Sequence, residues 1–233
     1  MEVRKIINYV KDIIFPVACV ECGVEGEWWC EQCLSKIILT PVNRCPVCHD
    51  LTAAGSVCAP CRSQSFLDGV AAFFPYDESA PIGRLIKQYK YNYARGIEEV
   101  WGKIIAKNVS RSAGSTEVVT IIPIPLHPRR ARERGFNQAD VLAQFLAERL
   151  GCEWDRGSLR RVRYTQQQAH LSGAARQKNI RAAFQWTNTA VTPTSVLLVD
   201  DVFTTGATMQ ECARILKQAG AKKVWGWALA RGW

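Results

Sequence analysis

The chain has 233 residues, of which 48% are hydrophobic and 22% are charged, and this length leaves room for one core domain and a small appendage. The ordinary composition excludes a wholly disordered chain, a collagen-like repeat and a coiled coil. The formal net charge of +9 is unevenly distributed: residues 1–62 carry six Lys and Arg against seven Asp and Glu, whereas residues 63–233 carry 24 against 14. This change predicts a domain boundary near residue 62 and a basic larger domain, which favours partners that carry phosphate. A solvated basic face without a dedicated partner is the alternative.

The N-terminal segment predicts a short amphipathic helix and no export signal. Its apolar residues from Val3 to Ile14 follow helical spacing, and charged residues such as Lys11 interrupt them. The longest charge-free stretch, residues 182–199, contains a proline and several polar residues, so no membrane span is predicted. We therefore expect a cytoplasmic protein, and in that reducing compartment ten cysteines favour metal binding over disulfides.

Eight of the ten cysteines form four CxxC pairs. Seven residues separate the first two pairs and nine separate the last two. A CxxC turn places two thiolates on one side of a knuckle, and two such knuckles complete a tetrahedral zinc site. The predicted ligands form two sequential sets, Cys19, Cys22, Cys30 and Cys33, followed by Cys45, Cys48, Cys58 and Cys61.

Two structural zinc ions in an N-terminal double zinc ribbon are therefore predicted. Residues 1–62 are poor in large aliphatic side chains, and metal binding would supply the missing folding free energy. Interleaved pairing, first pair with third and second with fourth, is the alternative. His49 could replace one thiolate, but an uninvolved neighbour explains it better. Cys152 and Cys212 are interpreted as small buried apolar side chains.

Residues 82–91 predict a helix. Ile82, Leu85, Ile86 and Tyr89 have the spacing of a half-buried helix. The run Tyr-Lys-Tyr at 89–91 also interleaves aromatic and basic side chains, as single-strand binders do, but the helical pattern explains it better.

The apolar segment Val118–Pro125 predicts a central strand. It leads into Arg129 and Arg130, then into the sequence Arg-Gly-Phe-Asn-Gln at 134–138 and a helix that reaches about Leu150. Farther on, the polar segment 164–178 predicts a mobile flap, although a disordered connector explains it almost equally well. His127 and His170 are candidate acid–base groups, but loop residues without a role in proton transfer explain them better.

The segment from Val196 to Thr208 indicates a phosphate-binding site. Four consecutive aliphatic residues predict a strand buried on both faces, and the pair Asp200 and Asp201 ends it. A turn rich in Thr and Gly follows, and residues 209–220 have helical spacing with a glycine as the stop signal. A strand, a short polar turn and a helix N-terminus form an anion site, because backbone N–H groups converge there. The two acids suit ribose hydroxyls or Mg²⁺, and we expect both to face a wet cleft.

This segment resembles the motif by which type I phosphoribosyltransferases bind 5-phosphoribosyl 1-pyrophosphate (PRPP). The resemblance places Asp200 and Asp201 on the ribose hydroxyls as candidate catalytic residues. It places a second group around the 5′-phosphate, namely Thr204, Thr205, Gly206, Ala207 and Thr208.

The order of the motifs along the chain resembles the ComF/GntX family over roughly residues 17–231. Members of that family are linked to natural transformation and to the use of extracellular DNA. The resemblance implies an α/β fold, in which a phosphoribosyltransferase-type domain with an open, mainly parallel sheet follows the double zinc ribbon. It also implies PRPP with Mg²⁺ as ligand, and single-stranded DNA and proteins of the DNA-uptake machinery as partners.

Ligands of an open α/β sheet bind at the carboxyl ends of the strands, so the loop at 125–130 should face the turn at 200–208. Type I enzymes use the first of these loops for pyrophosphate. The candidate ligands for pyrophosphate or DNA are Arg129, Arg130, Arg134, Arg163 and Arg176.

Two hypotheses of function remain at this stage. In the first, the protein transfers 5-phosphoribose from PRPP-Mg²⁺ to an unknown acceptor, with basic side chains stabilising the leaving pyrophosphate. In the second, it is a non-enzymatic handler of single-stranded DNA whose pocket only binds phosphates. A PRPP-sensing transcription regulator is the weakest hypothesis, because no helix-turn-helix pattern is present.

Overall fold

The structure is a computed structural model. It describes residues 17–37, 41–91, 96–109, 119–164, 180–188 and 192–232. The helix expected at 3–14 and the candidate ligand Arg176 lie outside these residues, as do His170 and nearly all of the segment 164–178. Within the described residues, no helix combines the length and the apolar character that a membrane crossing requires.

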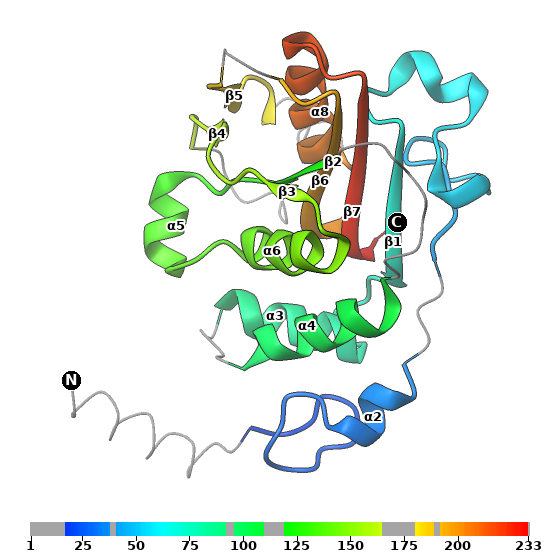
Figure 1. The fold of residues 1–233 in the computed structure, drawn as a ribbon. Coiled ribbons are helices and arrows are strands. Elements are labelled where there is room, and N and C mark those ends of the chain that lie inside the picture. The colour runs from blue at the N-terminus through cyan, green and yellow to red at the C-terminus, as the bar shows by residue number, and fades with distance from the viewer. Residues whose placement is uncertain are drawn as a thin grey trace.

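Five strands form one parallel sheet in the order β1-β7-β6-β2-β3 (Figure 1). Their bounds are β1 (Gly69–Pro75), β2 (Val119–Pro123), β3 (Glu153–Trp154), β6 (Ser195–Phe203) and β7 (Lys223–Arg231). This arrangement confirms the predicted open, mainly parallel sheet. The central strand β6 is longer than expected, because Asp200 and Val202 still pair with Ala228 and Ala230 of β7.

Helices cover both faces of this sheet. On one face lie α3 (Pro81–Tyr91), α4 (Ile97–Asn108) and α6 (Gln138–Leu150), and on the other lies α8 (Ala207–Ala219) (Figure 1). Each face has its own hydrophobic core: the first core lies under α3, α4 and α6, and the second lies under α8. Successive side chains of a strand point to opposite faces, so Ile121 of β2 is buried in the first core and Ile122 in the second. Burial on both faces explains why β2 and β6 read as continuous apolar runs.

A small antiparallel pair of strands stands apart from the main sheet. It consists of β4 (Leu159–Arg161) and β5 (Phe184–Trp186). The side chains of Leu159 and Phe184 are buried in the same core as α8. The pair therefore lies on the α8 side of the molecule, where it carries Arg161 toward the carboxyl end of the sheet.

The first cysteine-rich segment contains the short helix α2 (Glu31–Ser35) and packs against α3 and α4 (Figure 1). The Lys107 ammonium of α4 donates hydrogen bonds to the carbonyls of Leu34 (3.2 Å) and Ser35 (2.6 Å). The indole of Trp29 is buried in the same core as these helices. This segment is therefore part of the first core of the molecule.

The second cysteine-rich segment lies along the edge strand β1. It contains two 3₁₀ helices, Ala53–Gly55 and Ala59–Gln64. The backbone N–H of Val42 donates to the carbonyl of Ala72 (2.7 Å), and Ser56 pairs with Gly69. These contacts cover part of an edge that would otherwise expose unpaired backbone groups. The domain boundary near residue 62 stays a prediction.

Arg231, at the end of β7, joins the second cysteine-rich segment to the sheet. Its side chain is fully buried and lies over the ring of Phe203, 5.3 Å from the ring centre. The guanidinium donates to the carbonyls of Arg44 and Cys45, each at 2.7 Å. A buried cation that satisfies two buried carbonyls is costly to remove, because both acceptors lose their partner at once.

We expect Arg231→Met to lower the free energy of unfolding by about 3 kcal/mol, because two charge-assisted hydrogen bonds are removed and two carbonyls stay buried. Urea denaturation followed by tryptophan fluorescence measures this change. The control is Lys223→Met, since that exposed lysine begins the same strand. Equal stability of the two variants would contradict the role assigned to Arg231.

Candidate functional sites

A cavity of about 590 Å³ opens at the carboxyl ends of β2 and β6. Its wall includes the loop after β2, the junction between α5 (Pro128–Arg134) and α6, the end of α3 and the turn between β6 and α8. The loop at 125–130 and the turn at 200–208 therefore meet in one cavity, as the sequence analysis expected. We call this cavity the sheet-edge pocket.

The turn between β6 and α8 forms one side of the sheet-edge pocket. All five residues of the predicted phosphate group, 204–208, line it. Gly206 has a φ of 71°, and a Cβ at this position would lie 2.5 Å from the ring of Phe203. Only glycine meets both conditions. It also brings no capping side chain to α8, so the positive end of the helix dipole is directed into the pocket.

The two acids of the motif lie in different environments. Both line the pocket, and the backbone N–H of Asp201 donates to the Asp200 carboxylate at 2.9 Å. Asp201 is buried, with 8% of its surface exposed, whereas Asp200 is half-buried. The expectation that both acids face a wet cleft is therefore wrong for Asp201.

Lys90 of α3 is the partner of the buried acid. Its ammonium lies 2.7 Å from Oδ2 of Asp201, and its side chain is 22% exposed. Burial alone would lower the pKa of Lys90, but the carboxylate of Asp201 more than compensates and raises it. The sequence analysis assigned this lysine to a helix pattern and missed its place in the pocket. The helix pattern itself is confirmed, since Tyr89 is buried.

Asp200 holds a proton more tightly than an ordinary aspartic acid. Burial and the neighbouring Asp201 carboxylate raise the pKa of Asp200 to about 8, although Lys90 opposes this shift. An acid with a raised pKa beside an ionised acid is the pattern of a coupled carboxyl pair.

Some of the basic side chains near the carboxyl end of the sheet line the pocket, and others lie outside its wall. Arg130 and Arg134 line the pocket, as does Arg161 of β4, which the sequence analysis did not select. Burial and then the nearby Arg130 lower the pKa of Arg161. Arg129 is not part of the wall: it is exposed and pairs with Glu133 at 3.0 Å. Arg163 is exposed and also lies outside the wall.

Three residues of the sequence Arg-Gly-Phe-Asn-Gln at 134–138 line the sheet-edge pocket: Arg134, Asn137 and Gln138. The side chain of Asn137 donates to the carbonyl of Ile124 at 3.0 Å and so holds the loop after β2. Phe136 packs on Tyr89 of α3, with ring centres 4.8 Å apart. Arg134 donates to the buried side chain of Gln138 at 2.8 Å. This element therefore positions a strand loop, a helix and a cation together.

His127 has a structural role in the described structure. Its Nδ1 accepts a hydrogen bond from the backbone N–H of Arg129 at 3.2 Å and caps α5. Its ring also packs edge-on against Tyr164, at 5.2 Å between ring centres. These contacts favour the interpretation of a loop residue over that of an acid–base group.

The eight predicted cysteine ligands gather in two clusters. The members of each cluster have their sulfur atoms within 4.8 Å of one another, and the clusters are Cys19, Cys22, Cys30 and Cys33, and Cys45, Cys48, Cys58 and Cys61. The grouping confirms sequential pairing and excludes the interleaved alternative. His49 belongs to neither cluster, and its ring lies 3.2 Å from the Arg231 guanidinium.

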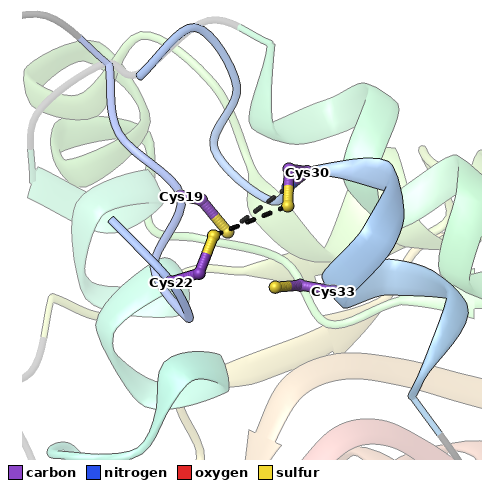
Figure 2. Close-up of side chains that lie close together, drawn as sticks. All are labelled: Cys19, Cys22, Cys30 and Cys33. Atoms are coloured by element: carbon purple, nitrogen blue, oxygen red, sulfur yellow. Dashed lines mark hydrogen bonds between the residues drawn. The ribbon is translucent and has the colours of Figure 1, made fainter. Parts of the chain in front are cut away.

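Both clusters have the geometry of a metal site. Figure 2 shows the four thiols of the first cluster pointing toward one another. The sulfur atoms of Cys22 and Cys30 are 3.7 Å apart, and those of Cys48 and Cys58 are 3.6 Å apart. Zinc–sulfur bonds of about 2.3 Å in a tetrahedron place sulfurs about 3.8 Å apart. The donor set and its spacing therefore fit one four-thiolate metal ion in each cluster.

The first CxxC turn of each cluster has the same backbone hydrogen bond. In the first cluster the N–H of Gly23 donates to the carbonyl of Cys19 at 2.9 Å, and in the second cluster the N–H of His49 donates to the carbonyl of Cys45 at 3.1 Å. Both Gly23 and His49 have a positive φ, 77° and 65°. His49 therefore occupies the turn position that a glycine occupies in the first knuckle.

Comparison with known proteins agrees with the fold and the clusters. Residues 137–230 match the family described as "Phosphoribosyl transferase domain". This match covers α6, the phosphate turn and all but the last residue of β7, and the parallel sheet with its helices has a phosphoribosyltransferase-like fold. A solved adenine phosphoribosyltransferase from Leishmania tarentolae aligns with 70% of this chain and 91% of its own at 11% identity, with a TM-score of 0.37, which is too distant to inform function.

Three curated relatives resemble most of the chain. "DNA utilization protein YhgH" of Salmonella typhimurium is 34% identical over 93% of this chain and 93% of its own length. "Competence protein F" of Haemophilus influenzae is 30% identical over 93% and 98%. "Competence protein ComFC" of Bacillus subtilis is 26% identical over 82% and 78%. The chain therefore belongs to the ComF/YhgH family of competence and DNA utilization proteins.

We expect the purified protein to contain about two zinc ions per chain, as two four-thiolate sites require. Cys22→Ser and Cys48→Ser should each leave about one, because three thiolates hold the ion poorly, and the double variant should leave none. Inductively coupled plasma mass spectrometry measures the content. Cys152→Ser is the matched control, since this half-buried cysteine lies outside both clusters. Metal-free protein with an unchanged Tm in chelator would refute the prediction.

Proposed function

We propose that this protein binds PRPP with Mg²⁺ in the sheet-edge pocket and handles single-stranded DNA in the cytoplasm, in DNA uptake or in the use of extracellular DNA. The observation that carries the proposal is the set of polar groups at the carboxyl end of β6. Two acids, then the turn with its left-handed Gly206, then the N-terminus of α8 all line one cavity. An acid pair beside an anion site suits a ligand that presents both hydroxyls and phosphate.

The charge of the pocket supports the same ligand. Four basic side chains line it, Lys90, Arg130, Arg134 and Arg161. Four acidic side chains also line it, Glu78, Glu133, Asp200 and Asp201. Burial and the Asp201 carboxylate raise the pKa of Asp200, which reduces the negative charge of the wall. Arg130 and Arg134 are the proposed ligands of a pyrophosphate group.

A transferase reaction is the first form of this proposal. Phosphoribosyl transfer from PRPP releases pyrophosphate, and the developing negative charge is stabilised by fixed cations such as Arg130 and by the Mg²⁺ that accompanies the ligand. Asp200 and Asp201 are the proposed catalytic residues because the resemblance to the PRPP motif places them on the ribose hydroxyls and both line the cavity. In the alternative form the pocket only binds phosphates, and the basic rim holds single-stranded DNA. Release of pyrophosphate with DNA, nucleosides or bases as acceptors decides between the two forms.

Partners are also part of the proposal. Relatives that carry the names of competence and DNA utilization proteins support single-stranded DNA and proteins of the uptake machinery as partners. The exposed Arg129 and Arg163, which stand outside the pocket wall, suit the phosphates of a strand better than a buried pyrophosphate.

The PRPP arm is tested with Asp200→Asn at pH 8.5, which keeps the size of the side chain and removes its charge. We expect the Kd for PRPP-Mg²⁺ to rise roughly thirtyfold, since a charge-assisted hydrogen bond contributes about 2 kcal/mol. Isothermal titration calorimetry with and without Mg²⁺ measures it, and Glu148→Gln on the exposed face of α6 is the control. Equal affinity of wild type and Asp200→Asn would end the PRPP assignment.

Asp201→Asn answers a different question. Its carboxylate pairs with a nearly buried lysine, so this change leaves an ammonium without its partner and lowers stability as well as affinity. It is therefore less suited to test binding alone than the Asp200 variant.

The DNA arm is tested with Arg129→Ala combined with Arg130→Ala. We expect weaker binding of an oligothymidine, and a slope of log affinity against log salt that falls by about 0.7 for each phosphate that the protein no longer neutralises. Fluorescence anisotropy over a salt series measures both. Lys222→Ala is the control, because it removes a positive charge just before β7, at the amino ends of the strands and away from the pocket. It should leave the slope unchanged. An unchanged slope in the double variant would place the DNA-binding surface elsewhere.

A further inference from the structure

Tyr164 is an exposed aromatic side chain at the rim of the sheet-edge pocket. It lines the pocket wall, and 44% of its surface is exposed. In the part of the chain that the structure describes, the other exposed aromatic side chain is Phe66, which lies outside the wall. A single exposed aromatic is ordinary on a protein surface. The cations around Tyr164 are what distinguish it.

Two arginines of α5 lie over the ring of Tyr164. The guanidinium carbon of Arg129 is 4.9 Å from the ring centre, and that of Arg130 is 5.7 Å from it. Both distances are within the range of cation–π attraction. Glu133 is the acid of this surface, and it pairs with Arg129 at 3.0 Å where both side chains are exposed. The cluster therefore combines one accessible aromatic ring with two positive charges.

The backbone holds this ring where β4 ends. The N–H groups of Val162 and Arg163 both donate to the carbonyl of Ala183, at 2.8 and 3.4 Å. Leu159, at the start of β4, is buried in the second core. The side chains at 162–164 are all exposed. The strand therefore anchors the segment in the core and brings an aromatic ring and a further cation to the surface beside the pocket.

An aromatic ring beside arginines suits an unpaired nucleotide. The base of a single strand stacks on such a ring, while the guanidinium groups contact the phosphates of the backbone. On binding, a base takes the place of a guanidinium on the ring, and a phosphate becomes the new partner of that guanidinium. Bases that are paired in a duplex are stacked on one another and do not reach the ring. The chemistry of this cluster therefore favours single strands over duplexes.

We propose that Tyr164 is a base-stacking platform for single-stranded DNA: one base of the strand lies on its ring at the rim of the sheet-edge pocket, and Arg129 and Arg130 hold neighbouring phosphates. The inference rests on the proposed handling of single-stranded DNA and adds the residue that distinguishes unpaired from paired bases. The occupant is a strand and not a free nucleotide, because the exposed Arg129 and Arg163 extend the basic surface beyond the pocket wall.

The first measurement is the affinity for an oligothymidine by fluorescence anisotropy. Tyr164→Ala should raise the Kd about tenfold, as the loss of one base–aromatic stack does, and Tyr164→Phe should keep the wild-type Kd. Phe66→Ala is the matched control, because Phe66 is 46% exposed and lies outside the pocket wall. An unchanged Kd in Tyr164→Ala, an equal loss in Phe66→Ala, or a Tyr164→Phe variant as weak as Tyr164→Ala would overturn the proposal.

The second measurement separates stacking from a purely structural role. A strand of the same length with abasic sites keeps every phosphate and removes every base. Wild type and Tyr164→Ala should therefore bind the abasic strand equally well, and the salt slope for oligothymidine should be the same in both proteins, because no charge is removed. If Tyr164 only ordered the two arginines, the variant would lose as much affinity for the abasic strand as for oligothymidine. That result, or a lower salt slope in Tyr164→Ala, would overturn the proposal.

Competition with thymidine monophosphate tests the size of the ligand. It should displace labelled oligothymidine only at far higher concentration than unlabelled oligothymidine does, and equal potency would replace the strand by a free nucleotide and overturn the proposal. The failure of this proposal differs from that of the proposed function. If wild type binds no oligothymidine, the handling of DNA fails and the stacking role fails with it. If wild type and Tyr164→Ala bind oligothymidine equally well, the stacking role alone fails.

Discussion

The position of β6 determines the rest of the site. This strand is hydrogen-bonded to β2 and β7 and is covered by a core on each face, so its path is set by burial and not by the polar groups at its end. Pairing with β7 continues to Phe203, which extends the strand through both acids and holds both of them in the wall of the sheet-edge pocket. The phosphate turn and α8 then begin where the strand ends. The pairing and burial of this one strand therefore set where the acids and the turn lie.

Around that strand, the pocket balances opposite charges with little excess. Lys90 pairs with the buried acid, and burial raises the pKa of the other. Arg130, Arg134 and Arg161 bring further positive charge to the same cavity wall.

The two cysteine clusters lie against different parts of the same molecule. The first packs on α3 and α4, and therefore supports the helix that carries Lys90. The second covers the edge of β1 and receives the guanidinium of Arg231. Neither segment has a large core of its own, so contact with the α/β domain helps to hold each of them, and a metal ion in each cluster would add to this stabilisation.

The sequence by itself determined the features that are local in the chain. The CxxC spacing predicts both clusters and their sequential pairing, the aliphatic runs predict β2 and β6, and the stretch from Asp200 to Thr208 predicts the strand end, turn and helix. Local patterns suffice there because the interacting residues are neighbours in the chain. The tertiary structure decided which distant residues complete the site. Lys90 lies 111 positions before its acid, and its helix spacing predicts burial on one face without naming the partner on the other. Arg161 and the unequal burial of the two acids depend in the same way on how α3, α6 and β4 pack around the sheet, because packing between distant segments sets both burial and charge neighbours.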